Sequence, residues 1–254
     1  MSSTTSLSNR TNLFVAAGVA VLAVIGGVVS YLSGYAPDAV SINEAAASLQ
    51  DDEAAAEDDA PASADDTAAA EGIDGTWTVD TSIGEFSVLE TTGTFVGFRI
   101  DEELSTIGET EAVGRTPGVE GEITIEDGTM TAATFTADVT IIESDDSRRN
   151  DKIFTALEAG TFPTATFTLT DPVEVGEIAD GEVVDVTAEG TLTVHGVEQP
   201  VTVPLQATVQ DGVAIVTGSF EITFADYDVQ VPSAPIVLSV SDVGDVEFQL
   251  FLTR

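Results

Sequence analysis

The chain has no cysteine, one histidine and few basic residues, and each shortage removes a class of function. Without cysteine there are no disulfides, thiolate metal sites or thiol nucleophiles. One histidine cannot supply the two or three imidazoles of a histidine-rich zinc site. Asp and Glu outnumber Lys and Arg by 45 to 7, for a net charge of −38. A surface of this sign repels phosphate, so nucleic acid is not expected as a partner.

Charged residues are also absent from Leu13–Leu32, a run of twenty largely apolar residues. As a helix this run would extend about 30 Å, enough for the core of a bilayer. Tyr31 and Tyr35, at the C-terminal end of this run, lie where an aromatic belt would be expected. We therefore predict a transmembrane anchor over residues 13–35.

The orientation of this anchor is predicted from the scarcity of basic residues. Arg10 is the only base before Arg99, which predicts a cytoplasmic N-terminus at residues 1–12 and an extracytoplasmic remainder at the cell membrane. The alternative is a secretory signal that is cleaved, leaving a secreted protein. The apolar core of a secretory signal is usually about 7–15 residues, which is shorter than this run. Pro37 directly follows the best small-residue cleavage site, Gly34-Tyr35-Ala36, and disfavours cleavage there.

Residues 36–72 consist largely of Ala, Asp and Glu, with almost no large apolar side chain. Such a segment buries too little surface to offset the entropy lost on ordering. We predict a disordered, self-repelling linker here. The acids lack EF-hand spacing, so no calcium site is predicted.

From residue 73 to 254 the sequence alternates between apolar and polar residues with period two, as amphipathic strands do. In "MTAATFTADVTII", for example, Phe135 and Ala137 share a face opposite Thr134 and Thr136. We predict about eight antiparallel strands and one short helix near 151–159. Tight turns are expected at 126–128, 195–200 and 210–212. Because several strands are long, we expect the sheet to close into a barrel.

His195 follows the strand-like "GTLTV" and precedes Gly196, which indicates a residue in or beside a hairpin turn. A catalytic histidine needs a nucleophile or a second base nearby. The chain contains no G-x-S-x-G, H-E-x-x-H, phosphate-binding loop or dinucleotide fingerprint. We therefore predict no enzymatic activity, no catalytic residue, no metal site and no cofactor.

Four blocks of sequence resemble the YceI-like family in the family's order. They are "GTWTVDTSIGEFSV", "RRNDKIFTALEAGTFPTATFTLT", "GTLTVHGVEQPVTVPL" and "ADYDVQVPSAPIVLSVSDVGDVEFQL". One departure is Asn150, which separates an Arg and an Asp that the family usually has side by side. The pattern "GETEAVGRTPGVEGEITI" is similar to a membrane-anchored branch. The resemblance implies an all-β, lipocalin-like barrel over 73–254 whose lumen binds a polyisoprenoid or another long apolar chain.

Under this resemblance the inward-facing aromatic residues become candidates for contact with the lipid. The lumen candidates are Phe86, Phe98, Phe135, Phe167, Phe220 and Phe248. Periodicity alone also allows a packed interior without a ligand, because small barrels are often filled by their own side chains. Trp77 is expected to plug one end of the barrel.

Three of the six basic residues in 73–254 lie close together: Arg148, Arg149 and Lys152. Arg148 and Arg149 are candidate contacts for a lipid head group such as a phosphate. The alternative is that these bases pair with the neighbouring acids Asp145, Asp146 and Asp151.

The expected function is that of a membrane-tethered, extracytoplasmic protein that holds an apolar lipid without catalysis. The alternative is a surface interaction or stress-protection protein with a filled barrel and no ligand.

Overall fold

Antiparallel strands dominate the structure, a computed structural model that describes residues 36–56, 72–105, 108–231 and 237–254. The helices among these residues are α2 (Ile42–Ala56), α3 (Ser147–Ala156) and the 3-10 helices η2 (Val139–Ile141) and η3 (Phe224–Tyr227). The strands are β1 (Gly75–Val79), β2 (Phe95–Leu104), β3 (Gly108–Thr116), β4 (Val119–Glu126), β5 (Thr129–Asp138), β6 (Glu143–Ser144), β7 (Thr164–Leu169), β8 (Val173–Glu174), β9 (Val184–Val194), β10 (Val197–Gln210), β11 (Val213–Thr223), β12 (Val237–Val240) and β13 (Val243–Thr253).

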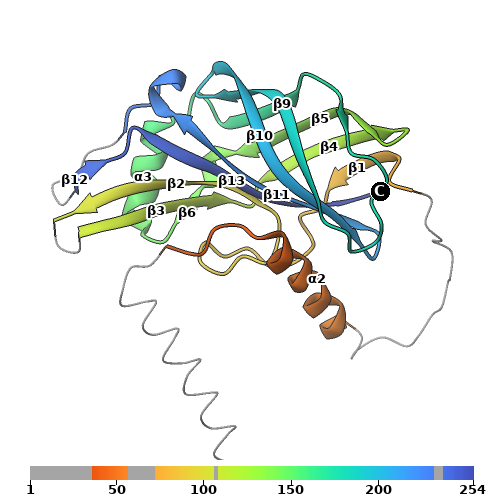
Figure 1. Cartoon of the computed structure of the whole chain (residues 1–254). Coiled ribbons are helices and arrows are strands. Elements are labelled where there is room, and N and C mark those ends of the chain that lie inside the picture. Colours follow the sequence, from red (N-terminus) through yellow and green to blue (C-terminus); the bar gives the residue numbers. More distant parts are fainter. Residues whose placement is uncertain (1–35, 57–71, 106–107, 232–236) are drawn as a thin grey trace, which may run out of the picture. The chain divides into compact units, whose positions relative to one another are not determined.

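Eight of these strands form a closed ring in the order β1-β4-β5-β7-β9-β10-β11-β13 (Figure 1). The ring closes where β1 pairs with β13, through Thr78 opposite Thr253 and Val79 opposite Leu252. Strand β2 pairs with the preceding part of the same edge of β13, and β3 and β6 continue outward from β2. The predicted antiparallel barrel is therefore confirmed, with eight strands in its ring.

The tight turns form where the sequence predicts them. Each of three hairpins turns through two residues with positive φ: Asp127-Gly128, His195-Gly196 and Asp211-Gly212. Two positive φ values in succession define a type I′ turn, whose twist matches that of the flanking strands. His195, with φ of 53°, is thus a turn residue, as predicted.

The short helix is also present, but it begins four residues earlier than predicted. Helix α3 starts at Ser147 and includes the polar residues 148–150, which carry no apolar periodicity. It ends shortly before Glu158, which adopts a left-handed conformation with φ of 43°. This shift places Arg149 on the helix rather than in the loop before it.

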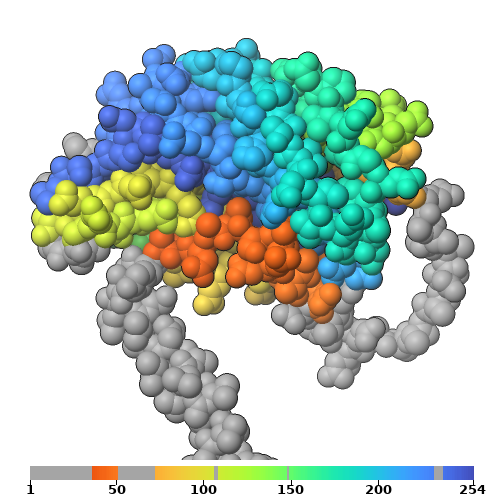
Figure 2. All heavy atoms as spheres, in the orientation of Figure 1, coloured from red at the N-terminus to blue at the C-terminus, as the bar shows by residue number. Residues whose placement is uncertain are grey.

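The prediction of a disordered linker over residues 36–72 is wrong for its first part. Residues 42–56 form helix α2, on which Ile42, Ala45 and Leu49 are buried. These side chains pack against Ile215 and Phe251, outward-facing residues of β11 and β13 that have no exposed surface. The spacing i, i+3, i+7 gathers them on one helix face, so three apolar residues suffice where the barrel offers an apolar surface. Figure 2 shows the segment from Ala36 lying against the barrel.

The remaining predictions for the N-terminal third concern residues that the structure does not describe. The cytoplasmic segment 1–12, the anchor at 13–35 and residues 57–71 of the linker lie outside the described residues. None of the helices in the described ranges is long and apolar enough to cross a membrane.

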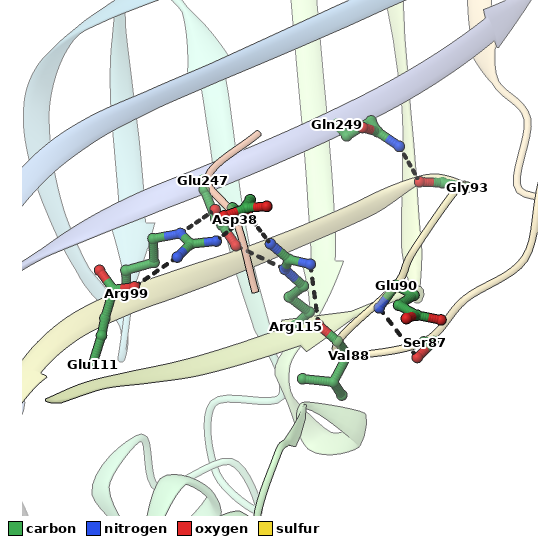
Figure 3. A network of polar contacts seen from close by, with 10 residues as sticks. All are labelled: Asp38, Ser87, Val88, Glu90, Gly93, Arg99, Glu111, Arg115, Glu247 and Gln249. Atoms are coloured by element: carbon green, nitrogen blue, oxygen red, sulfur yellow. Dashed lines mark hydrogen bonds and ion pairs between the residues drawn. The ribbon is translucent and has the colours of Figure 1, made fainter. Parts of the chain in front are cut away.

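A buried ionic network holds the same N-terminal segment to the outer face of β2, β3 and β13 (Figure 3). Glu247 has no exposed surface and accepts hydrogen bonds from Arg99 Nε at 2.6 Å and Arg115 Nε at 2.7 Å. Both guanidinium groups also donate to the backbone oxygen of Asp38. Arg99 further pairs with Glu111 at 2.7 Å. The carbonyl of Asp38 thus provides one acceptor for two buried cations.

The network keeps Arg99 charged. Burial would lower the pKa of Arg99, but the hydrogen bonds and negative charges of Glu247 and Glu111 outweigh it and raise the pKa above its usual value. Arg99 is therefore a buried cation whose charge is balanced by Glu247 and Glu111.

Replacing Glu247 by Gln should destabilise the protein by about 3–5 kcal/mol, because two buried guanidinium groups lose their shared carboxylate. Urea unfolding of the full chain measures this loss. Asp245→Asn, at an exposed position on the same strand, is the control, with an expected change of about 0.5 kcal/mol or less. Similar losses in the two variants would contradict a structural role for the network.

Leu49→Ala should cost about 2–5 kcal/mol, because it empties a buried site between α2 and the barrel. The control is Gln50→Ala, on the exposed face of the same helix. If residues 36–56 were a free tether, both substitutions would leave the free energy of unfolding unchanged.

Candidate functional site

The interior of the barrel contains a cavity of about 810 Å³. This volume lies within the range of about 300–1,000 Å³ that ligand pockets occupy. All eight strands of the ring contribute side chains to its wall, and most of these side chains are Val, Ile, Leu, Ala or Phe. The interior is therefore lined rather than filled, and the alternative of a packed interior is not supported.

Five of the six predicted lumen residues lie in the wall of the cavity: Phe98, Phe135, Phe167, Phe220 and Phe248. Phe86 does not line the cavity, because it lies in the loop between β1 and β2, where period two does not apply. Contact of the five wall residues with a ligand stays a prediction.

Trp77 also lies in the wall and is 1% exposed. Its indole Nε1 donates a hydrogen bond to the backbone oxygen of Ile73 at 2.8 Å. The guanidinium of Arg254 lies over its ring, 4.5 Å from the ring centre. These contacts hold the indole in place as an apolar part of the wall.

Charge in the wall is confined to one region, beside helix α3. Within the described ranges, the charged wall residues are Glu102, Asp146, Arg149 and Lys152. Three belong to α3 or the residue before it, and Glu102 of β2 reaches α3 through an ion pair of 2.6 Å with Arg149. Lys152 is exposed, so this charged part of the wall reaches water.

Of the two arginines predicted to contact a head group, the structure describes the side chain of Arg149 alone. Arg149 pairs with Glu102 and with Asp145, so the alternative of pairing with a neighbouring acid is confirmed for Asp145. With two carboxylates on one guanidinium, little of its charge is left for a phosphate. The side chain of Arg148 lies outside the described residues, and its contact with a head group stays a prediction.

The side chain of His195 contacts the backbone of Tyr227. Tyr227 is buried in the wall, and burial, with a smaller effect from Asp226, raises its pKa to about 12. Its phenol is neutral at physiological pH, as that of an ordinary tyrosine is, and can act as a hydrogen-bond donor. The backbone oxygen of Tyr227 lies 3.1 Å from His195 Nδ1, and the imidazole packs edge-on against Phe162. His195 is thus held as a packed turn residue.

Glu102 and Tyr227 are wall residues that were not predicted from the sequence. For Glu102 a signal exists, because period two from Phe98 and Ile100 places it inward, where a carboxylate breaks the apolar pattern. Tyr227 follows β11 on a 3-10 helix, so no strand periodicity extends to it.

The fold and cavity define a class of protein: a closed antiparallel β-barrel with an apolar lumen and a charged rim. The profile of the YceI-like domain matches residues 86–252, more than half of the chain. The chain therefore belongs to the YceI-like family.

Two solved structures show the same fold. One is a polyisoprenoid-binding domain from Saccharophagus degradans implicated in plant cell wall breakdown. It is 19% identical, with a TM-score of 0.52 over 70% of this chain and 98% of the other. The second is BcnA from Burkholderia cenocepacia, also 19% identical, with a TM-score of 0.50 over 68% and 98% of the two chains. A comparison with curated proteins gives no match.

Because Arg149 is already paired, we expect Arg149→Gln to change the affinities for geranylgeraniol and geranylgeranyl phosphate by the same factor. Titration of both lipids into the full chain measures this. Lys152→Gln is the comparison, since the exposed ammonium of Lys152 forms no ion pair within the described part of the chain. A loss for the phosphate alone in Arg149→Gln would instead assign Arg149 to the head group.

Proposed function

We propose that this protein is a non-catalytic lipid-binding protein that holds a polyisoprenoid or a similar long apolar chain in its barrel, as a carrier or a store. The observation that carries the proposal is the 810 Å³ cavity, whose charged wall residues in the described ranges all lie beside α3. An apolar chain can lie along such a lumen with a polar head at the charged rim. The Saccharophagus degradans relative, described as a polyisoprenoid-binding domain, supports the class of ligand.

Burial of apolar surface would supply the binding free energy. Each 100 Å² of apolar surface removed from water contributes about 2.5 kcal/mol. Several hundred Å² of a prenyl chain would therefore offset the cost of association and ordering, which is about 4–15 kcal/mol. Affinity would depend mainly on how much of the chain fits inside.

Catalysis receives no support from the cavity wall. The charged wall residues include an Arg149–Glu102 ion pair, and His195 packs in its turn against Phe162. Within the described ranges, no three His, Cys, Asp or Glu side chains are grouped so that they could hold a metal ion. The barrel therefore holds its ligand chemically unchanged in this proposal.

We also propose that the protein is exported and stays at the cell membrane through an anchor at residues 13–35. The uncharged run Leu13–Leu32 supports this, and secretion after cleavage is the alternative. Because residues 36–49 pack on the barrel, an anchor would be joined to it by a very short connection. Only Ala36 and Pro37 separate the anchor in sequence from Asp38, whose carbonyl is bound by two arginines.

Native mass spectrometry of the full chain, purified in a mild nonionic detergent from a lipid-producing host, tests the proposal. We expect one apolar adduct per chain that is released on denaturation. Ala133→Phe, which adds a ring inside the cavity, should lose the adduct. Ala132→Phe, the exposed neighbour on the other face of β5, should keep it.

The parent chain and the two variants together distinguish a lipid in the lumen from a lipid bound elsewhere and from no lipid at all. No adduct in the parent chain, together with no binding of added geranylgeraniol, would refute lipid binding. An adduct that survives equally in both variants would place the lipid outside the lumen.

A further inference from the structure

Five glycines of the sheet, four in the ring and Gly114 on β3, lie two residues from a cavity-wall residue of the same strand, on the face that alternation turns toward the cavity. Gly190 of β9, for example, lies between the wall residues Ala188 and Leu192, and Gly218 of β11 between Val216 and Phe220. In each case the ring of a phenylalanine from a neighbouring element fills the vacated space. The pairs are Gly114–Phe98, Gly121–Phe135, Gly190–Phe167, Gly218–Phe248 and Gly244–Phe224.

The contacts are too close to allow any other residue at these positions without movement. A Cβ atom added to Gly114 would lie 2.6 Å from Cε1 and 2.7 Å from Cζ of Phe98. At Gly218 the same atom would lie 2.5 Å from Cζ of Phe248, and at Gly190 2.2 Å from Cε2 of Phe167. Each ring therefore lies across the backbone of the next strand.

Four of the five pairs are made between neighbouring strands, and the fifth joins Phe224 of η3 to Gly244 of β13. Phe98 is directly opposite Gly114 in the register of β2 and β3, and Phe248 is opposite Gly218 in β13 and β11. Phe135 is opposite Gly121 in β5 and β4. All five phenylalanines belong to the cavity wall. A ring that lies over a neighbouring glycine forms part of the wall and leaves the lumen open.

We propose that these phenylalanine–glycine pairs set the width of the lumen and thereby determine which apolar chains it accepts. This rests on the proposed lipid-binding function and adds to it the residues that fix the width of the site. A methyl group at one of these glycines would push the paired ring away from the backbone. The open space beside the ring is the lumen, so the ring would move into it. The glycines are thus binding determinants without contacting the ligand themselves.

Gly114→Ala is the sharpest test, because the nearest atoms to the new methyl group are all in side chains, Phe98 and Ile142. We expect the displaced Phe98 ring to weaken binding of geranylgeraniol to the delipidated full chain by at least about tenfold. The double variant Gly114→Ala, Phe98→Ala has no ring to project into the lumen and should bind geranylgeraniol more tightly than Gly114→Ala alone, by at least about threefold. Gly160→Ala is the control, since its methyl group would be 3.8 Å from the nearest atom.

Thermal unfolding of each variant shows whether a loss of binding comes from a narrower lumen or from an unfolded protein. Unchanged geranylgeraniol affinity in a folded Gly114→Ala would overturn the proposal, as would a loss of affinity that removal of the ring does not lessen. Unfolding of Gly114→Ala alone, with a folded double variant, would also overturn it, because the ring would then have no room to move into the lumen. Unfolding of both variants would overturn it too, because the fold would then require the glycine whatever side chain faces it.

Failure of this proposal is distinct from failure of lipid binding. A parent chain that binds no geranylgeraniol refutes the proposed function itself. A parent chain that binds it, together with a Gly114→Ala variant of equal affinity, refutes only the role of the pairs.

Discussion

Closure of the sheet is the constraint on which the remaining structure depends. It is made by a short pairing of β1 with β13, where Thr78 faces Thr253 and Val79 faces Leu252. Once the ring is closed, the inward side chains of all eight strands face one another across a common interior. A ring of this size is filled if those residues are large. Here many are Val or Ala, and several rings lie over glycines, so a cavity remains.

Strand β13 links the interior of the barrel to its outer surface. Val246, Phe248 and Leu250 point into the cavity, whereas Glu247 and Phe251 point outward and are buried beneath the N-terminal segment. Glu247 binds arginines from two other strands, and those arginines bind the carbonyl of Asp38. A buried charge left without its partner is costly, so the folded domain includes residues 36–49 and does not begin at residue 73.

Much of the barrel can be predicted from the sequence because its signals are local. Alternation identifies the strands, and Asp-Gly and His-Gly pairs identify the hairpins. The same period places Phe98, Phe135 and Phe248 in the wall correctly. It fails for Phe86, because the chain after β1 is a loop.

The features that sequence analysis misses depend on residues far apart in the chain. Helix α2 has few apolar residues, diluted by Ala and acids, and only the surface at Ile215 and Phe251 makes them sufficient. The Glu247 network joins three strands whose register the sequence does not reveal. The glycine pairs are visible in the sequence only as small residues beside large ones on one strand. Their actual partners lie on neighbouring elements.

The most direct test of a ligand in the lumen uses Trp77, the only tryptophan in the chain, which lies in the cavity wall. Retinol, a neutral isoprenoid that quenches tryptophan emission by energy transfer, would be titrated into the delipidated full chain. A lipid-binding lumen predicts saturable quenching at one retinol per chain, reversed by geranylgeraniol. Quenching that rises linearly without saturation, or that geranylgeraniol does not reverse, would contradict a lipid site inside the barrel.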